Sequence, residues 1–86
     1  MNIANPVRWE ELVQSLIVPM VGHPEQVAIA VESTSNGGVA IRAKVHPDDA
    51  GRVIGSRGTT LAAIAQIVDF AGKRAGTPAS ITLADG

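Results

Sequence analysis

The sequence contains no cysteine and only two aromatic residues, Trp9 and Phe70. Without cysteine there is no disulfide, no thiol nucleophile and no thiolate metal site, a pattern typical of proteins from a reducing compartment. With so few rings, the interior must be built mainly from Val, Ile, Leu and Ala. Stacking of nucleic-acid bases on aromatic side chains is therefore at most a minor option.

A long apolar run and an excess of positive charge are also missing. No stretch approaches the ~18 apolar residues of a membrane span, and no basic region followed by an apolar segment begins the chain, so we expect a soluble, cytoplasmic protein outside the membrane. Seven Lys and Arg against eight Asp and Glu give a formal net charge of -1. A broad basic surface for nucleic acid is thereby excluded, and any phosphate contact must be local and built largely from backbone.

We expect the 86 residues to form one domain over 1–86. The spacing of apolar residues predicts six secondary-structure elements in it. In order these are a helix over 7–21, strands over 27–33 and 39–45 joined by a turn at 35–38, a short helix starting at His46 and Pro47, a helix over 59–73 and a strand over 80–83. Pro19 falls in the last turn of the first helix, where an earlier end is the alternative. Asn5 is the expected N-cap of the first helix, with Pro6 at its first position.

The order α-β-β-α-α-β predicts an α+β fold. The first two strands are expected to pair antiparallel, while the helical pair between the second and third strands suits a parallel crossover of the usual right hand. The prediction is a three-stranded mixed sheet with helices packed on one face.

A glycine-bounded segment, Gly55-Ser56-Arg57-Gly58, joins the two later helices and is too short for anything but a tight turn. Its amides, with those at the start of the next helix near Thr59 and Thr60, are expected to point at one spot suited to a phosphate. Beyond the loop, three apolar side chains are predicted to contact the bases: Val53, Ile54 and Leu61. Five basic side chains are predicted to contact the RNA at the flanks: Arg42, Lys44, Arg52, Lys73 and Arg74. A cationic helix C-terminus is an equally good account of Lys73 and Arg74.

The stretch from Gly51 to Leu61 resembles the KH signature, in which an apolar pair precedes G-x-x-G and an apolar residue follows three positions later. The resemblance covers almost the whole chain and is closest in kind to the small bacterial single-KH proteins of the KhpA (YlqC) family. It implies a type II KH fold, binding of single-stranded RNA, and a role as an RNA chaperone. It also implies pairing with a larger KH-containing KhpB (Jag) partner in the control of cell shape and wall growth.

The chain departs from that family where basic residues are common, since it has Ser56 in the loop and the uncharged residues Thr59, Thr60, Ala62 and Ala63 on the following helix. RNA binding by the isolated domain is therefore expected to be weak and its dependence on a partner greater. The alternative function is a protein-interaction or dimerisation module with residual nucleic-acid affinity.

An apolar flank on the helix 59–73 bears on that alternative. Ala63, Ile67 and Phe70 lie beside the core-facing row, so the apolar arc is wider than packing on one sheet requires. The flank is either a dimer contact, with a second copy or a KhpB-like partner, or a surface packed on the opening helix near Trp9 and Leu16. The sequence leaves both open.

Catalysis and cofactor binding find little support. Residues 51–58 have neither the spacing nor the Lys of a P-loop, and no strand leads directly into this turn. His23 and His46 flank prolines and lack acidic or histidine neighbours at ligand spacing, and Asp48 and Asp49 are typical of helix-start charges. No nucleophile and base are paired. We expect a protein that is not an enzyme, with no metal, no cofactor and no small-molecule substrate.

Overall fold

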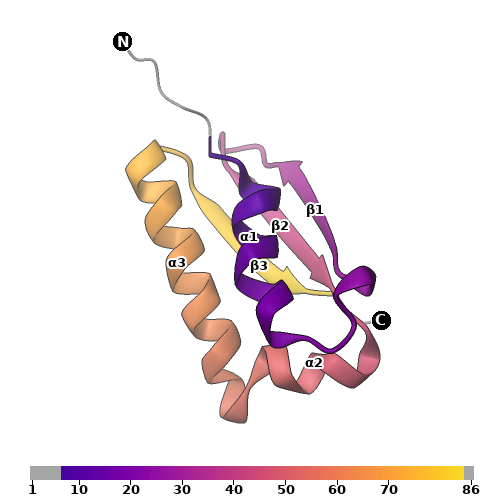
Figure 1. The fold of residues 1–86 in the computed structure, drawn as a ribbon. Helices are drawn as coiled ribbons and strands as arrows, with labels where there is room; N and C mark the ends of the chain where they lie inside the picture. The colour runs from indigo at the N-terminus through magenta and orange to yellow at the C-terminus, as the bar shows by residue number, and fades with distance from the viewer. Residues whose placement is uncertain (1–6, 85–86) are drawn as a thin grey trace.

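The computed structural model describes residues 7–84 and shows an α+β fold in which the helices cover one face of a mixed sheet (Figure 1). The elements are α1 (Trp9–Ile17), β1 (Ala28–Ser33), β2 (Val39–Lys44), α2 (Pro47–Ile54), α3 (Thr59–Ala75) and β3 (Ala79–Leu83). Three short 3-10 helices accompany them, η1 (Val18–Met20), η2 (Pro24–Gln26) and η3 (Ser56–Gly58). The predicted order α-β-β-α-α-β is confirmed.

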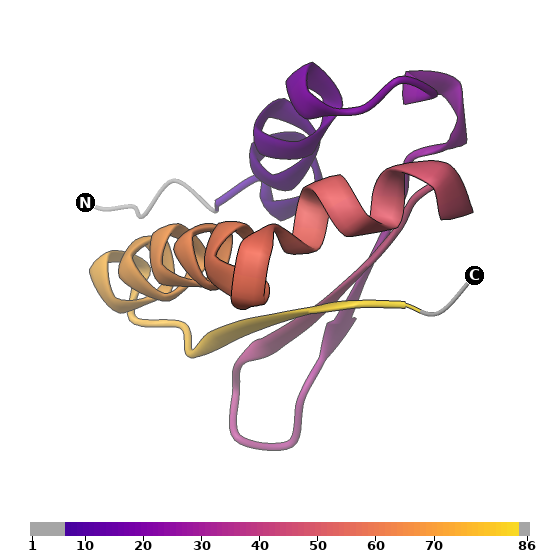
Figure 2. The same cartoon turned by 90° about the horizontal axis from the view of Figure 1, so that it is seen from below.

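The sheet has the strand order β1-β2-β3. β1 pairs antiparallel with β2, with Val31 opposite Ile41, and β2 pairs parallel with β3, with Ile41 opposite Ile81. Figure 2 shows the helices on one side of the strands and the β1–β2 hairpin reaching beyond them. The predicted mixed sheet, covered on one face, is therefore present.

The core lies between the helices and this covered face. Central strand β2 contributes Ile41 and Ala43, each 1% exposed, because successive side chains on a strand alternate between the two faces. Strand β3 contributes Ile81, and Val45 follows β2 directly. The other buried apolar residues come from the three helices, Trp9, Val13, Ile17, Val53, Ile64 and Val68. The opposite face of the sheet stays open, and Arg42 and Lys44 are exposed there.

The opening helix ends early, the alternative that Pro19 offered. It ends at Ile17 instead of residue 21, and the chain continues as η1 with Pro19 inside it. Proline has no N–H to donate and its ring clashes with the carbonyl four residues earlier, so it interrupts the α-helical pattern. The predicted cap, Asn5 with Pro6, lies outside the described residues; the residue before α1 is Arg8. Each helix in the described part of the chain is too short or too polar to cross a bilayer.

Candidate nucleic-acid interface

The Gly55–Gly58 loop lies where α2 meets α3, at the lower end of α3 in Figure 1. The backbone N–H of Gly55 donates to the carbonyl of Gly51 at 2.8 Å, and that of Gly58 donates to the carbonyl of Gly55 at 3.1 Å. The Thr59 hydroxyl donates to the Ser56 carbonyl at 2.8 Å. These bonds hold the loop as a closed corner, with Ser56 and Arg57 exposed.

The two glycines are required for different reasons. Gly55 has φ 80° and ψ 172°, a conformation essentially restricted to glycine, and a Cβ there would collide with Thr60. Gly58 has φ 74°, but a Cβ on it would meet no atom within 4 Å. Gly55 thus allows the corner to close against α3, while Gly58 leaves the surface over the corner open.

Arg57 adopts a left-handed conformation, with φ 57° and ψ 26°. Within residues 7–84 it is the one residue other than glycine with a positive φ. Strained backbone of this kind is concentrated at binding and catalytic sites, where the surrounding structure enforces it. Here the enforced conformation places a full positive charge at the corner.

The charge around the corner differs in sign from that of the whole chain. Residues 50–68 contain two arginines, Arg52 and Arg57, and no acidic residue, although the formal net charge of the chain is -1. The start of α3 adds the positive end of its helix dipole. The stretch that forms the corner therefore carries a net positive charge, although the chain as a whole does not.

The prediction of free amides at the start of α3 needs one correction. The N–H of Thr59 donates to the Ser56 carbonyl, and that of Gly58 is used within the loop. Because the first four N–H groups of a helix have no partner one turn earlier, the donors that remain at this end are those of Thr60 and Leu61. The amides for an anion thus begin one residue later than expected.

The apolar residues predicted to contact bases have different exposures. Val53 is 0% exposed, so its side chain supports the loop from the core and offers no surface to a base. Ile54 is 38% exposed and Leu61 is half-buried. The apolar surface beside the corner is therefore that of Ile54 and Leu61.

Most of the predicted flanking cations lie away from the loop. Arg52 is near it, with Nη1 3.4 Å from the Met20 carbonyl. Arg42 and Lys44 occupy the open face of the sheet. Lys73 and Arg74 lie near the other end of α3, about 20 Å away at 1.5 Å per residue. Of these five predicted cations, Arg52 is the one that lies within three residues of the loop in sequence, and its guanidinium is directed at the Met20 carbonyl.

Lys73 and Arg74 have neighbours of their own. The Lys73 ammonium lies 3.0 Å from the Asp69 carboxylate, and the Arg74 guanidinium lies 5.9 Å from the centre of the Phe70 ring. Phe70 is 62% exposed and Ile67 is 43% exposed. Much of the flank of Ala63, Ile67 and Phe70 is therefore exposed on α3, and the Phe70 ring in particular is not buried against α1.

A polar cluster that the sequence analysis missed lies at the other end of α2. Asp49 is buried, and its carboxylate accepts the N–H groups of Gly22 and His23, each at 3.0 Å. The hydrogen bond from Gly22, with those from the backbone and ring of His23, holds the pKa of Asp49 below its ordinary value although burial raises it. Asp49 lies in the first turn of α2, as expected of a helix-start acid, and it is also a buried link between α2 and the 22–23 turn, which the sequence analysis missed.

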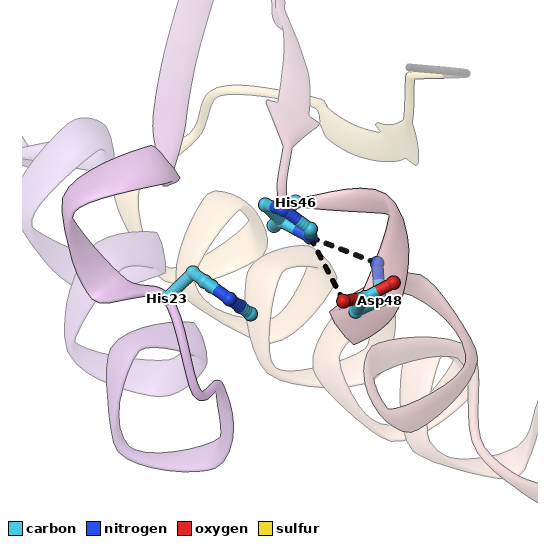
Figure 3. Close-up of side chains that lie close together, drawn as sticks. All are labelled: His23, His46 and Asp48. Atoms are coloured by element: carbon cyan, nitrogen blue, oxygen red, sulfur yellow. Dashed lines mark hydrogen bonds and ion pairs between the residues drawn. The ribbon is translucent and has the colours of Figure 1, made fainter.

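The two histidines have partners as well. His23 Nδ1 lies 3.1 Å from Asp49 Oδ2. His46 Nδ1 accepts the backbone N–H of Asp48 at 3.0 Å and so caps α2, as a dashed line in Figure 3 shows. Their rings stack with centroids 3.9 Å apart. The expectation that they lack acidic or histidine neighbours is therefore wrong. Contacts between residues more than 20 positions apart depend on the fold, and local spacing gave no signal of them.

A G-x-x-G corner between two helices, packed on a mixed three-stranded sheet in the order α-β-β-α-α-β, defines a KH domain of type II. A sequence model of the family described as "KhpA/KhpB, KH domain" matches residues 10–83. The chain belongs to this KhpA family.

Individual relatives agree with the assignment. The "RNA-binding protein KhpA" of Bacillus subtilis is 38% identical over 63 residues, 73% of this chain and 76% of the relative. The protein of the same name from Listeria monocytogenes is 38% identical over 65 residues, 76% of this chain and 84% of the relative. That of Streptomyces coelicolor is 37% identical over 65 residues, 76% of this chain and 81% of the relative.

Proposed function

We propose that this chain is a non-catalytic RNA-binding protein, a single KH domain that grips the backbone of single-stranded RNA at the Gly55–Gly58 corner. The observation that carries the proposal is the corner itself: a Cβ at Gly58 would meet no atom within 4 Å, and the stretch 50–68 around it contains Arg52 and Arg57 and no acidic residue. The similarity to proteins named RNA-binding protein KhpA supports it.

Binding would use close approach more than side-chain charge. A phosphodiester passing over Gly58 meets no side chain, so it reaches the positive end of α3 and the N–H groups of Thr60 and Leu61. Arg57 adds an ion pair. About four nucleotides fit such a corner, with bases against the apolar surface of Ile54 and Leu61. Contacts to backbone and apolar base faces carry little sequence information, so selectivity would be low.

The wider role rests on the family. KhpA resemblance supports an RNA chaperone in the cytoplasm that acts with a larger KhpB (Jag) partner in the control of cell shape and wall growth. The matched family model includes both KhpA and KhpB domains. Because the corner carries only two arginines, a partner that extends the RNA-binding surface would compensate for a small electrostatic contribution.

A second function, self-association or association with KhpB, is favoured by the flank of Ala63, Ile67 and Phe70. An aromatic side chain that is 62% exposed beside Ile67 forms an apolar surface of the kind that marks protein contacts. This flank and the Gly55–Gly58 corner are separate, so a dimer would leave the corner accessible.

The test is fluorescence anisotropy with a labelled single-stranded RNA and the Gly58→Asp variant. Aspartate fits the open space at position 58 but places a carboxylate where a phosphate would lie, so affinity should fall at least tenfold while the circular dichroism spectrum is kept. Gly37→Asp is the matched control, because Gly37 has φ 80° and equally open surroundings at the hairpin tip. Equal loss in both variants, or none in Gly58→Asp, would contradict the proposal.

Salt dependence provides a second readout. A phosphate site loses affinity as salt rises, with a slope set by the few ion pairs formed. Arg57→Ala should reduce that slope by about one. If wild-type protein binds no RNA at low salt but still self-associates, the assembly function replaces RNA binding.

A further inference from the structure

We infer that His23, His46 and Asp48 form a binding site for one divalent transition-metal ion at the start of α2, independent of the RNA-binding corner. One ligand atom from each of the three side chains can be chosen so that all lie within 4.8 Å of one another. Figure 3 shows His23 on the turn before η2, and His46 and Asp48 at the start of α2, where His46 is the N-cap and Asp48 lies in the first turn.

The orientation of His23 is fixed by a buried carboxylate. Both oxygens of Asp49 accept backbone N–H groups, one from Gly22 and one from His23, so Asp49 acts as a hydrogen-bond acceptor. The ring Nδ1, 3.1 Å from Asp49 Oδ2, is then the donor. Nε2 is left with its lone pair, in a side chain that is 38% exposed. A carboxylate that holds one ring nitrogen while the other faces outward is the usual support of a metal-binding histidine.

His46 and Asp48 supply the other two ligands. His46 Nδ1 lies 3.0 Å from the Asp48 amide, whose N–H it accepts, so this nitrogen also carries a lone pair. The Asp48 carboxylate lies 3.8 Å from the same nitrogen and is 77% exposed, free to turn toward an ion. Ligands at about 2.0 to 2.2 Å from zinc lie about 3.4 Å from one another in a tetrahedron. Because the chosen atoms lie up to 4.8 Å apart, the cluster must contract and rearrange to reach that spacing.

The stacking of the rings sets one requirement. The interplanar angle is 12°, and the in-plane lone pairs of two nearly parallel rings cannot both point at one ion. One ring must turn. His23 is held by buried Asp49, so His46 is the ring that turns, and the ion takes the lone pair that now caps α2. Binding therefore competes with the cap and is expected to be weaker than at a site with preformed geometry.

The ligand set defines the class of ion. Two imidazoles and one carboxylate suit Zn²⁺, Ni²⁺, Cu²⁺ or Co²⁺, whereas Mg²⁺ and Ca²⁺ prefer sites made of oxygen alone. Three protein ligands leave a tetrahedral ion one further position for water or another ligand.

The experiment is isothermal titration of tag-free, chelator-treated full-length protein with ZnCl₂ and NiCl₂, together with Co²⁺ absorption as a report of coordination. We expect saturable binding of one ion per chain. His46→Asn removes the imidazole but keeps a side chain that caps helices well, and His23→Gln removes the second imidazole. Each should weaken binding at least tenfold with the circular dichroism spectrum unchanged. Glu32→Gln, which removes an exposed carboxylate from β1, is the control and should bind as wild type does.

Three results would overturn the inference: no saturable binding to the wild-type protein, stoichiometry unrelated to one ion per chain, or affinities of both histidine variants equal to that of the wild type. If either variant fails to fold, the wild-type Co²⁺ spectrum decides, because a fully hydrated ion shows no new ligand-field band. RNA binding is measured separately, so failure of the metal site leaves the RNA-binding proposal standing.

Discussion

Gly55 and Thr60 are in contact across the loop, so closely that a Cβ on Gly55 would lie 2.7 Å from Thr60 Cβ and 2.8 Å from its backbone nitrogen. Because Thr60 belongs to the first turn of α3, a side chain at position 55 would push the corner away from the helix that it begins. The glycine at position 58 faces no such obstacle. The two ends of the motif therefore differ in what a substitution does.

We predict that Gly55→Ala lowers the free energy of unfolding by about 3 kcal/mol, from a disfavoured backbone conformation and the collision with Thr60. Gly58→Ala should cost about 1 kcal/mol, the cost of a left-handed conformation alone. Urea denaturation of both variants measures the difference. Equal losses would show that the closure of the corner does not depend on the missing Cβ at Gly55.

Arg57 should show opposite effects on stability and on RNA binding. Arg57→Gly relieves the left-handed backbone conformation, so the free energy of unfolding is expected to rise by about 0.5 to 1 kcal/mol, since part of the relief is offset by the larger entropy of glycine in the unfolded chain. RNA affinity should fall several-fold because one phosphate contact is lost. Arg57→Lys, which keeps both the charge and the strain, is the control. If Arg57→Gly binds RNA as tightly as wild type does, the Arg57 side chain makes no contact with RNA.

The fold was predictable because local patterns and tertiary contacts agree. In 39–45 apolar residues alternate with others, which specifies the buried face of β2, and the structure buries Ile41 and Ala43 on that face. The glycine-bounded loop was also predictable, since its identity lies in four consecutive residues. Pro19 is a local signal too, and it ends α1 early for the reason that proline usually does.

The roles of Asp49 and Val53 were less accessible. An acid after a helix-starting proline has a good local explanation, and only the fold brings the Gly22 and His23 amides to it. Val53 belongs to the apolar pair before the loop, but the rotation of α2 buries it while Ile54 stays exposed. Residues whose role depends on which way a short helix turns cannot be assigned from an eight-residue pattern.

Asp49 predicts a specific dependence of stability on acid. Its pKa is lower in the folded protein than the ordinary value of 3.8, chiefly because of the hydrogen bond from Gly22. The carboxylate therefore stabilises the fold at pH values above 3.8, and this contribution is lost as the pH falls through the lowered folded pKa. Asp49→Asn should have a lower melting temperature than wild type at pH 7, with the gap narrowing below pH 3.8. A gap independent of pH would indicate that packing, and not the charge, supports the 22–23 turn.

Phe70 decides whether the outer flank of α3 is an assembly surface. The ring is exposed, and its guanidinium neighbour Arg74 covers it only partly at 5.9 Å. Burial of an aromatic side chain and of Ile67 against the same residues of a second copy would stabilise a dimer, and a carboxylate inside that contact would be desolvated without a partner. If wild-type protein sediments as a dimer, Phe70→Asp should shift the mass measured by light scattering to that of one chain.

Gln66→Asp is the control, because it adds the same charge at an exposed position of the same helix and should leave the dimer intact. Because Phe70 is far from the Gly55–Gly58 corner, monomeric Phe70→Asp should keep its affinity for a short RNA. If both variants dissociate, general charge repulsion and not this flank controls assembly, and if neither does, the dimer forms elsewhere.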